Sequence, residues 1–206
     1  MKRHGGLRER KKQRTRETID RVALELFNER GYHATTLADI AEAAEVSTRT
    51  IFAYFPSKED ILFSEFPALK QALAQALAER PEGKDALETV RDFILASHQG
   101  KPDDPSEQRD RIVRRDETLR THLRARMAEL EDVVAAAIAD DLGAAADDLR
   151  PQVVAASLIA AFEVLFDRQH GSPKTARNAD DVAAAIDPII TFLRGGLDAL
   201  KVHELR

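Results

Sequence analysis

Four consecutive residues carry side chains that can recognise DNA: Ser47, Thr48, Arg49 and Thr50. The hydroxyl of Ser47 can cap a helix, which would place the next three residues on the first turn of that helix. In a helix-turn-helix, this turn of the second helix meets the base edges in the major groove. The planar guanidinium of Arg49 suits the O6 and N7 atoms of guanine, although a phosphate contact or a solvated side chain is the alternative. The pattern predicts a DNA-reading helix.

The residues just upstream predict the first helix of the same motif. Thr36 and Asp39 nearly match a capping box, in which a hydroxyl accepts a bond from an otherwise free main-chain N–H. Apolar residues then recur at helical spacing and give this helix one buried face: Leu37, Ile40, Ala41 and Ala44. Two helices this short are marginal in water, so they need a third helix to pack against.

That third helix is predicted between about Lys11 and Arg30. Its apolar positions fall three and four residues apart: Ile19, Val22, Ala23, Leu26 and Phe27. Gly31 follows as the glycine that commonly ends a helix. The motif therefore has the support that its packing requires.

Positive charge is concentrated at the N-terminus. Residues 1–16 hold eight basic residues and one acid and so carry +7, whereas the whole chain is at −5, which leaves −12 on residues 17–206. Charge runs are usually solvated tails, but a basic run beside a helix-turn-helix in an acidic protein favours an arm that reaches DNA. We expect this arm at residues 1–10, and Arg14 of the same run among the DNA-binding residues.

A longer run, from Gly31 to Leu62, carries a set of residues at fixed spacing. They are Gly31-Tyr32, Thr35-Thr36, Ile40-Ala41, Ala44, Val46-Ser47, Thr50, Tyr54-Phe55 and Ser57-Lys58-Glu59. The run resembles the N-terminal DNA-binding domain of the TetR family of one-component bacterial regulators. This resemblance is detailed over about the first third of the chain, and the remainder matches only in length and helical character.

The resemblance implies an all-α protein of about nine helices. A three-helix DNA-binding domain at residues 11–62 would be followed by a larger helical bundle at 63–206, which binds an effector and dimerises. The resemblance also implies that Thr36, Tyr54 and Lys58 hold the phosphate backbone of double-stranded DNA.

The chain departs from the family pattern at two positions. Family members usually have glycine in the turn, where this chain has Glu45, and a non-glycine residue in a left-handed turn costs about 1 kcal/mol. Members often have tyrosine where this chain has Phe52, so a phosphate contact through that hydroxyl is lost or moved.

The rest of the chain is typical of helices and contains no cysteine. Periodicity and helix breakers predict one helix over about 58–79 with a kink at Pro67. Further helices are predicted over 85–97, 119–143, 151–170 and 179–200, with a short helix that ends near residue 115 before the second of these. No apolar run is long enough to cross a membrane, and no secretory signal is present. We expect a soluble, cytoplasmic protein without a membrane partner.

The last two predicted helices have strongly apolar faces. By resemblance they pair with those of a second subunit, which makes a homodimer that matches a palindromic operator. The predicted interface residues are Leu158, Val182, Ile186, Ile189, Leu193 and Leu197. The alternative is that both helices complete the core of a monomer.

The helices between residues 85 and 170 are expected, by resemblance, to enclose a pocket for a small, largely apolar effector. Its predicted lining is Phe93, His98, Arg115, His122, Met127, Phe162 and Phe166. The apolar members are more often plain core, and a solvated basic face is the commoner role for the arginines. The histidines lack the spacing of metal ligands, so neither a metal nor a cofactor is expected.

These features predict a transcriptional repressor that a small molecule releases from its operator. The chain shows no catalytic motif, so we expect no enzyme activity. Two other classes stay open: an architectural DNA-binding protein without sequence preference, and an enzyme with an accessory DNA-binding head.

Overall fold

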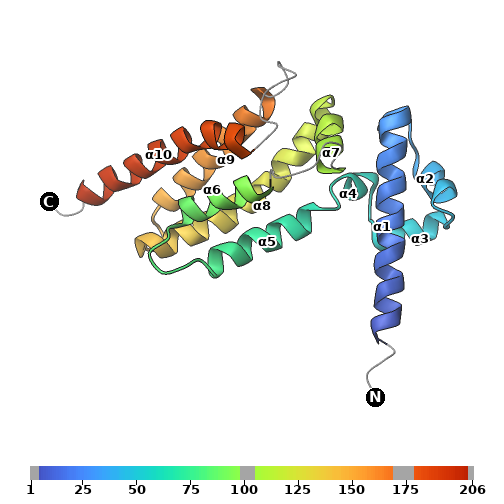
Figure 1. The fold of residues 1–206 in the computed structure, drawn as a ribbon, viewed down its shortest axis with the longest axis horizontal. Helices are drawn as coiled ribbons and strands as arrows, with labels where there is room; N and C mark the ends of the chain where they lie inside the picture. Colours follow the sequence, from blue (N-terminus) through green and yellow to red (C-terminus); the bar gives the residue numbers. More distant parts are fainter. Residues whose placement is uncertain (1–4, 98–104, 169–178, 204–206) are drawn as a thin grey trace. The chain divides into compact units, whose positions relative to one another are not determined.

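The computed structural model describes residues 5–97, 105–168 and 179–203 (Figure 1). Every regular element in these ranges is an α-helix, which confirms the predicted all-α class. The helices are α1 (Gly5–Arg30), α2 (Leu37–Ala43), α3 (Thr48–Tyr54), α4 (Lys58–Leu62), α5 (Phe66–Ala78), α6 (Ala86–Ser97), α7 (Pro105–Arg114), α8 (Glu117–Leu142), α9 (Arg150–Arg168) and α10 (Ala179–His203).

These helices fall into two compact units. The first unit holds Met1–Phe66 and Pro102–Leu123, and so includes α1 to α4, α7 and the start of α8. The second unit holds Pro67–Lys101 and Arg124–Arg206, with nearly all of α5, the rest of α8, and α6, α9 and α10. The chain therefore contributes α8 to both units.

Helix α1 supports the first unit, where it packs against α2, α4 and α7. Ile19 and Ala23 are fully buried on its inner face, and it ends at Gly31, whose φ is +90°. The predicted start near Lys11 is wrong, because the helix already begins at Gly5. The apolar repeat begins only at Ile19, but the strong helix formers Leu, Arg, Glu and Lys extend the helix by further turns without burying a face.

The predicted kinked helix over residues 58–79 is also wrong, since α4 ends at Leu62 and a new helix begins at Phe66. Pro67 is the second residue of α5 rather than an interior kink. A proline lacks the main-chain N–H, which makes no intrahelical bond in the first turn, so it fits there without disrupting the helix. This break explains why ten helices are described where about nine were expected.

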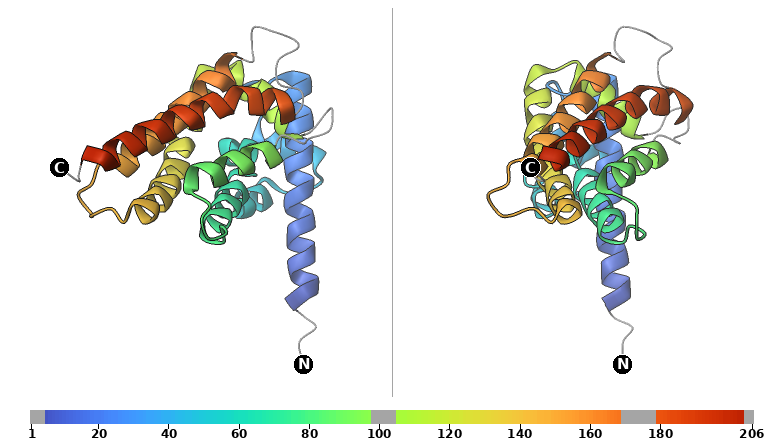
Figure 2. Two further views of the ribbon diagram at one scale, coloured as in Figure 1. Left: turned by 60° about the vertical axis from the view of Figure 1, so that its left-hand side comes forward. Right: turned by 90° about the vertical axis from the view of Figure 1, so that its left-hand side faces the viewer.

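In the second unit, α10 packs against both α6 and α9, and Figure 2 shows α9 and α10 running side by side. The core between these helices contains Leu87, Leu158 and Ile186, each at most 2% exposed. None of the helices that the structure describes is both long and apolar enough to cross a membrane.

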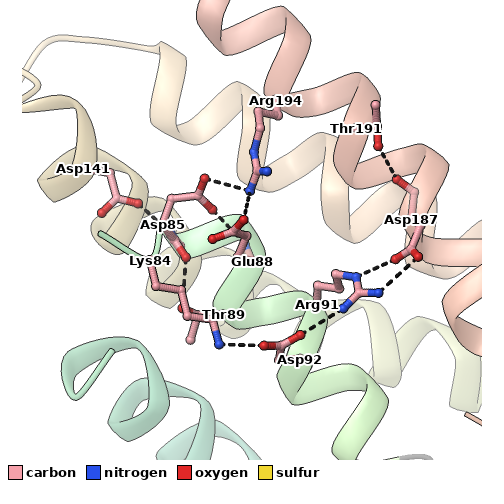
Figure 3. Close-up of polar contacts among 11 residues, drawn as sticks. Lys84, Asp85, Glu88, Thr89, Arg91, Asp92, Asp141, Asp187, Thr191 and Arg194 are labelled. Carbon is pink, nitrogen blue, oxygen red and sulfur yellow. Dashed lines mark hydrogen bonds and ion pairs between the residues drawn. The ribbon is translucent and has the colours of Figure 1, made fainter. Parts of the chain in front are cut away.

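Ion pairs join α6 to α10 as well (Figure 3). Arg91 donates two hydrogen bonds to the carboxylate of Asp187, from Nε at 2.5 Å and from Nη2 at 3.1 Å. On the same side, Arg194 pairs with Asp85 at 2.8 Å and with Glu88 at 3.1 Å. The hydrogen bonds from Arg91 lower the pKa of Asp187, because they favour its ionised form.

Candidate nucleic-acid interface

Helix α2 begins with the capping box that the sequence predicted. The hydroxyl of Thr36 accepts a 3.1 Å bond from the main-chain N–H of Asp39, and the carboxylate of Asp39 accepts a 2.7 Å bond from the N–H of Thr36. Hydrogen bonds from Thr36 lower the pKa of Asp39, so its negative charge is stabilised at the helix N-terminus. Thr36 is exposed, but these bonds already engage its side chain.

The turn between α2 and α3 passes through Glu45. Its φ is +55°, and it is the only non-glycine residue with positive φ among those described. The next residue, Val46, donates a 2.9 Å bond from its N–H to the carbonyl oxygen of Ala41 and closes the turn. The chain thus adopts the left-handed turn that glycine would favour, with a glutamate in its place.

Helix α3 is buried along its inner face and capped at its N-terminus. Ile51 and Phe55 are buried, at 0% and 1% exposure, and so anchor its inner face. The hydroxyl of Ser47 accepts a 3.1 Å bond from the N–H of Thr50 and lies 2.8 Å from the hydroxyl of that residue. The predicted reading residues Thr48 and Arg49 are exposed on the first turn of this capped helix. This turn is therefore presented outward on a rigid base.

Arg16 on α1 fixes the end of α3. Its Nη1 atom donates a 3.3 Å bond to the carbonyl oxygen of Tyr54, and its guanidinium carbon lies 4.5 Å from the centre of the Phe55 ring. The sequence identified Arg16 only as one member of a basic run, because its partners Tyr54 and Phe55 lie 38 and 39 positions later in the chain. Tyr54 is partly exposed at the edge of the motif.

The structure gives Lys58 a role inside the first unit. Its ammonium donates to the carbonyl oxygens of Tyr32 at 2.8 Å and Thr35 at 2.9 Å, and it lies 4.2 Å from the centre of the Tyr32 ring. Burial lowers the pKa of Lys58, since it disfavours the charged form. Two of the three N–H groups are thus bonded to the protein, and the phosphate contact implied by resemblance stays a prediction.

A groove of about 840 Å³ lies between the N-terminal half of α1 and the outer face of α3. It brings together Ser47, Arg49, Thr50 and Tyr54, four of the predicted DNA-binding residues. From α1 it is lined by Arg8, Glu9, Lys11, Lys12 and Thr15, which the sequence analysis did not single out. Arg14 is exposed but does not line this groove. Because α1 is helical from Gly5, the side chains of the basic run point to different sides of the helix, and Arg14 lies on another side than the residues that line the groove.

The predicted effector residues are divided between the two units. Arg115 is exposed and His122 half-buried in the first unit, whereas Phe93, Met127 and Phe162 belong to the second. Met127 is buried and the two phenylalanines are half-buried. His98 and the side chain of Phe166 lie outside the described residues.

Most residues predicted for the dimer interface lie within the chain's own core. Leu158, Val182, Ile186, Leu193 and Leu197 are each at most 7% exposed, and Ile189 is half-buried. All but Ile189 are therefore buried within the single chain, and their part in a dimer interface stays a prediction. Periodicity identifies an apolar stripe, but it does not say whether that stripe faces the same chain or another one.

Two family models match the chain. The model described as "Bacterial regulatory proteins, tetR family" matches residues 19–64, and the model described as "MftR C-terminal domain" matches residues 84–197. The first match contains the capped motif, and the second covers more than half of the chain.

Known proteins are similar over most of their length. The HTH-type transcriptional regulator TcmR of Streptomyces glaucescens is 37% identical over 160 residues, which are 73% of this chain and 71% of TcmR. The crystal structure of NalD, the secondary repressor of a Pseudomonas aeruginosa multidrug efflux pump, is similar in fold, with a TM-score of 0.66, 21% identity and coverage of 87% of this chain and 96% of NalD. SmeT, the repressor of a Stenotrophomonas maltophilia efflux pump, is similar in its complex with triclosan, with a TM-score of 0.64, 22% identity and coverage of 86% and 90%.

Proposed function

Since the chain belongs to the tetR family of bacterial regulatory proteins, we propose that it is a transcriptional repressor that binds a palindromic operator as a homodimer and is released by a small molecule. It acts in the cytoplasm, where the operator is, and has no catalytic role. The family membership establishes a DNA-binding regulator. The operator symmetry, the dimer and the effector are proposals for this chain.

The observation that carries the DNA-binding role is the exposed first turn of α3. A helix that reads bases must present polar side chains on its first turn while its other face is held firmly. Thr48 and Arg49 are exposed, and Ile51 one turn later is completely buried. Because Ser47 caps the helix, this turn is ordered before DNA binds, and little conformational entropy is lost on binding.

Exposed apolar stripes on α9 and α10 support a homodimer. On α9 the stripe runs through Val153, Ser157, Ala160 and Val164, and on α10 through Ala184, Pro188, Phe192, Gly195 and Ala199, all exposed. Residues three and four positions apart share a helix face, so each set forms one continuous strip. Phe192 is 78% exposed within the single chain, whereas large apolar side chains are normally buried.

The small residues around Phe192 allow a second pair of helices to approach closely, and the ring would fill the space that they leave. A two-fold axis between such pairs uses the same surface on both subunits. It also matches a palindrome whose half-sites lie about one helical turn apart. In the single chain these stripes are exposed, unlike most of the residues that the sequence predicted for the interface.

The effector is proposed to bind in the second unit, among helices that include Phe93, Met127 and Phe162. The SmeT structure with triclosan shows that a protein of this fold accommodates an apolar small molecule. To release the DNA, the effector must bind more tightly to the conformation that cannot bind DNA. DNA binding then weakens effector binding by the same factor by which the effector weakens DNA binding.

The test is selection of DNA fragments from the host genome with the full-length protein, followed by sequencing. We expect enrichment of fragments that share one palindromic motif. An architectural protein without sequence preference would enrich no motif, and this result would overturn the proposal. Compounds that raise the Tm of the free protein in a screen of apolar molecules are then expected to release the selected fragment.

A further inference from the structure

We propose that the groove between α1 and α3 holds one sugar–phosphate strand of DNA, so that the N-terminal turns of α1 act as a rigid second wall beside the reading helix. This inference rests on the proposed DNA-binding function and adds a contact surface to it. The strand concerned is the one that borders the major groove on the side of α3 that faces α1.

The shape of the first unit provides this groove. Figures 1 and 2 show the N-terminal half of α1 running on past α3 instead of ending beside it. The space between the two helices has a volume of about 840 Å³ and is lined from α1 by residues 8–15 and from α3 and its cap by residues 47–54. Because α1 is helical from Gly5, this wall exists before DNA arrives.

The charges of the lining fit a phosphodiester strand. Four basic side chains line the groove: Arg8, Lys11, Lys12 and Arg49. Glu9 is the one acid in the lining, so the groove carries a net positive charge in a chain whose overall charge is −5. Hydroxyl groups from Thr15, Ser47, Thr50 and Tyr54 complete it. Basic and hydroxyl side chains make most protein contacts to the DNA backbone.

The position of the groove favours a DNA strand over a small anion. Arg49 and Thr50 belong both to the first turn of α3 and to the lining of the groove. A helix in the major groove is bordered by the two phosphate backbones of the duplex. A strand that borders the reading face would therefore continue into this groove, where α1 lies on its other side.

The opposite face of the same turns offers a matched control. Arg8 and Arg10 are both exposed arginines on α1, two positions apart and so on different sides of the helix. Arg8 lines the groove, whereas Arg10 does not and instead donates a 2.9 Å bond from Nε to the carbonyl oxygen of Gly6. Replacing either residue with glutamine removes one charge from the same segment.

The experiment measures binding of the full-length protein to a genome-selected duplex and to a random duplex of equal length, from 50 to 300 mM salt. The logarithm of the binding constant falls linearly with the logarithm of the salt concentration, and each lost phosphate contact makes this negative slope shallower by about 0.9. We therefore expect Arg8→Gln to make the slope shallower by about 0.9 and the double variant Lys11→Gln/Lys12→Gln by about 1.8, equally on both duplexes. Arg10→Gln should change the slope much less.

A gain-of-affinity variant separates the proposal from damage to the fold. Glu9→Gln removes the one negative charge in the groove, so it should tighten binding to both duplexes. Equal effects of Arg8→Gln and Arg10→Gln, or no gain from Glu9→Gln, would overturn the groove as a strand site. If instead the wild-type protein binds both duplexes equally, the proposed function fails first, and the two failures are distinguishable.

Discussion

The ammonium of Lys58 donates a 2.8 Å hydrogen bond to the carbonyl oxygen of Tyr32 and lies 4.2 Å from the centre of the ring of the same residue. A second bond, to the carbonyl oxygen of Thr35, joins the start of α4 to the loop before α2. The hydroxyl of Tyr32 in turn donates to Glu59 at 2.7 Å. This cluster joins the start of α4 to the loop that precedes α2, so Lys58 stabilises the helix-turn-helix from within the first unit.

Lys58→Met is expected to destabilise the protein, because it leaves two carbonyl oxygens without their charged donor. Hydrogen bonds to charged groups contribute about 1.5–3 kcal/mol, so we expect a loss in this range in urea unfolding. Lys70→Met is the control: Lys70 forms a surface ion pair with Glu129, and such pairs contribute about 0–1 kcal/mol. Equal stability of Lys58→Met and wild type, with reduced DNA affinity, would instead favour a phosphate contact.

Glu45→Gly is expected to stabilise the protein, since a left-handed φ of +55° is unfavourable for a glutamate and accessible to glycine. The relief of about 1–2 kcal/mol is partly offset by the greater freedom of glycine in the unfolded chain. The net gain should be about 0.5–1 kcal/mol, or roughly 1–4 °C in Tm.

Glu42→Gly is the matched control for this prediction. Glu42 is exposed within α2, where glycine costs about 1 kcal/mol relative to good helix formers. The two substitutions should therefore move Tm in opposite directions. Destabilisation by both would show that the turn gains nothing from glycine.

Phe192→Glu should convert the proposed homodimer into a monomer in analytical ultracentrifugation. A charge placed in the centre of an apolar interface costs at least about 2 kcal/mol, which raises the dissociation constant by roughly thirtyfold. Leu7→Glu changes an exposed apolar residue, 58% exposed, that lies on α1 and so outside both stripes, and it should leave the dimer intact. A dimer that survives Phe192→Glu would remove the stripes as the interface.

The ion pair between Arg91 and Asp187 predicts a specific response to acid. The hydrogen bonds from Arg91 lower the pKa of Asp187 below its ordinary value of 3.8 in the folded chain. The folded chain therefore binds fewer protons than the unfolded chain near that value, so this stabilisation is complete above 3.8 and is lost as pH falls through the lower folded pKa.

Asp187→Asn should accordingly lose less stability than wild type between pH 5 and pH 2.5 in urea unfolding. Arg91→Gln should reduce the acid loss further, because Arg91 also pairs with Asp92 at 3.0 Å, and Lys84 and Arg91 together lower the pKa of that carboxyl. The double variant should match Arg91→Gln, because both substitutions remove the same pair between Arg91 and Asp187. A steeper acid loss in Asp187→Asn than in wild type would contradict this assignment.

The sequence predicted those features whose causes lie within a few residues. Thr36, Ser47 and Gly31 begin or end helices through local hydrogen bonds and backbone freedom, so their roles could be read directly. The start of α1 could not be placed, because its first turns bury nothing and leave no apolar repeat. The inward position of Lys58 depends on the loop 23–26 residues away, which no local pattern specifies.

The sequence did not identify the exposed stripes on α9 and α10, which we propose as the dimer interface, for a related reason. Periodicity detected the stripe that contains Leu158 and Ile186, which is stronger because it forms the core. The second stripe, around Phe192, consists mostly of alanine, glycine, proline and serine, whose weak hydrophobicity hides the pattern. Only the packing of α10 on α6 and α9 shows which stripe remains exposed.

The most direct test of the account is the ratio of dissociation constants for a genome-selected duplex and its scrambled counterpart, measured for wild type and Arg49→Ala at one salt concentration. A bidentate arginine–guanine contact discriminates by about 1–3 kcal/mol. We predict that wild type prefers the selected duplex strongly and that Arg49→Ala lowers this preference by roughly 5- to 150-fold. Equal binding of the two duplexes by wild type would contradict sequence reading by α3.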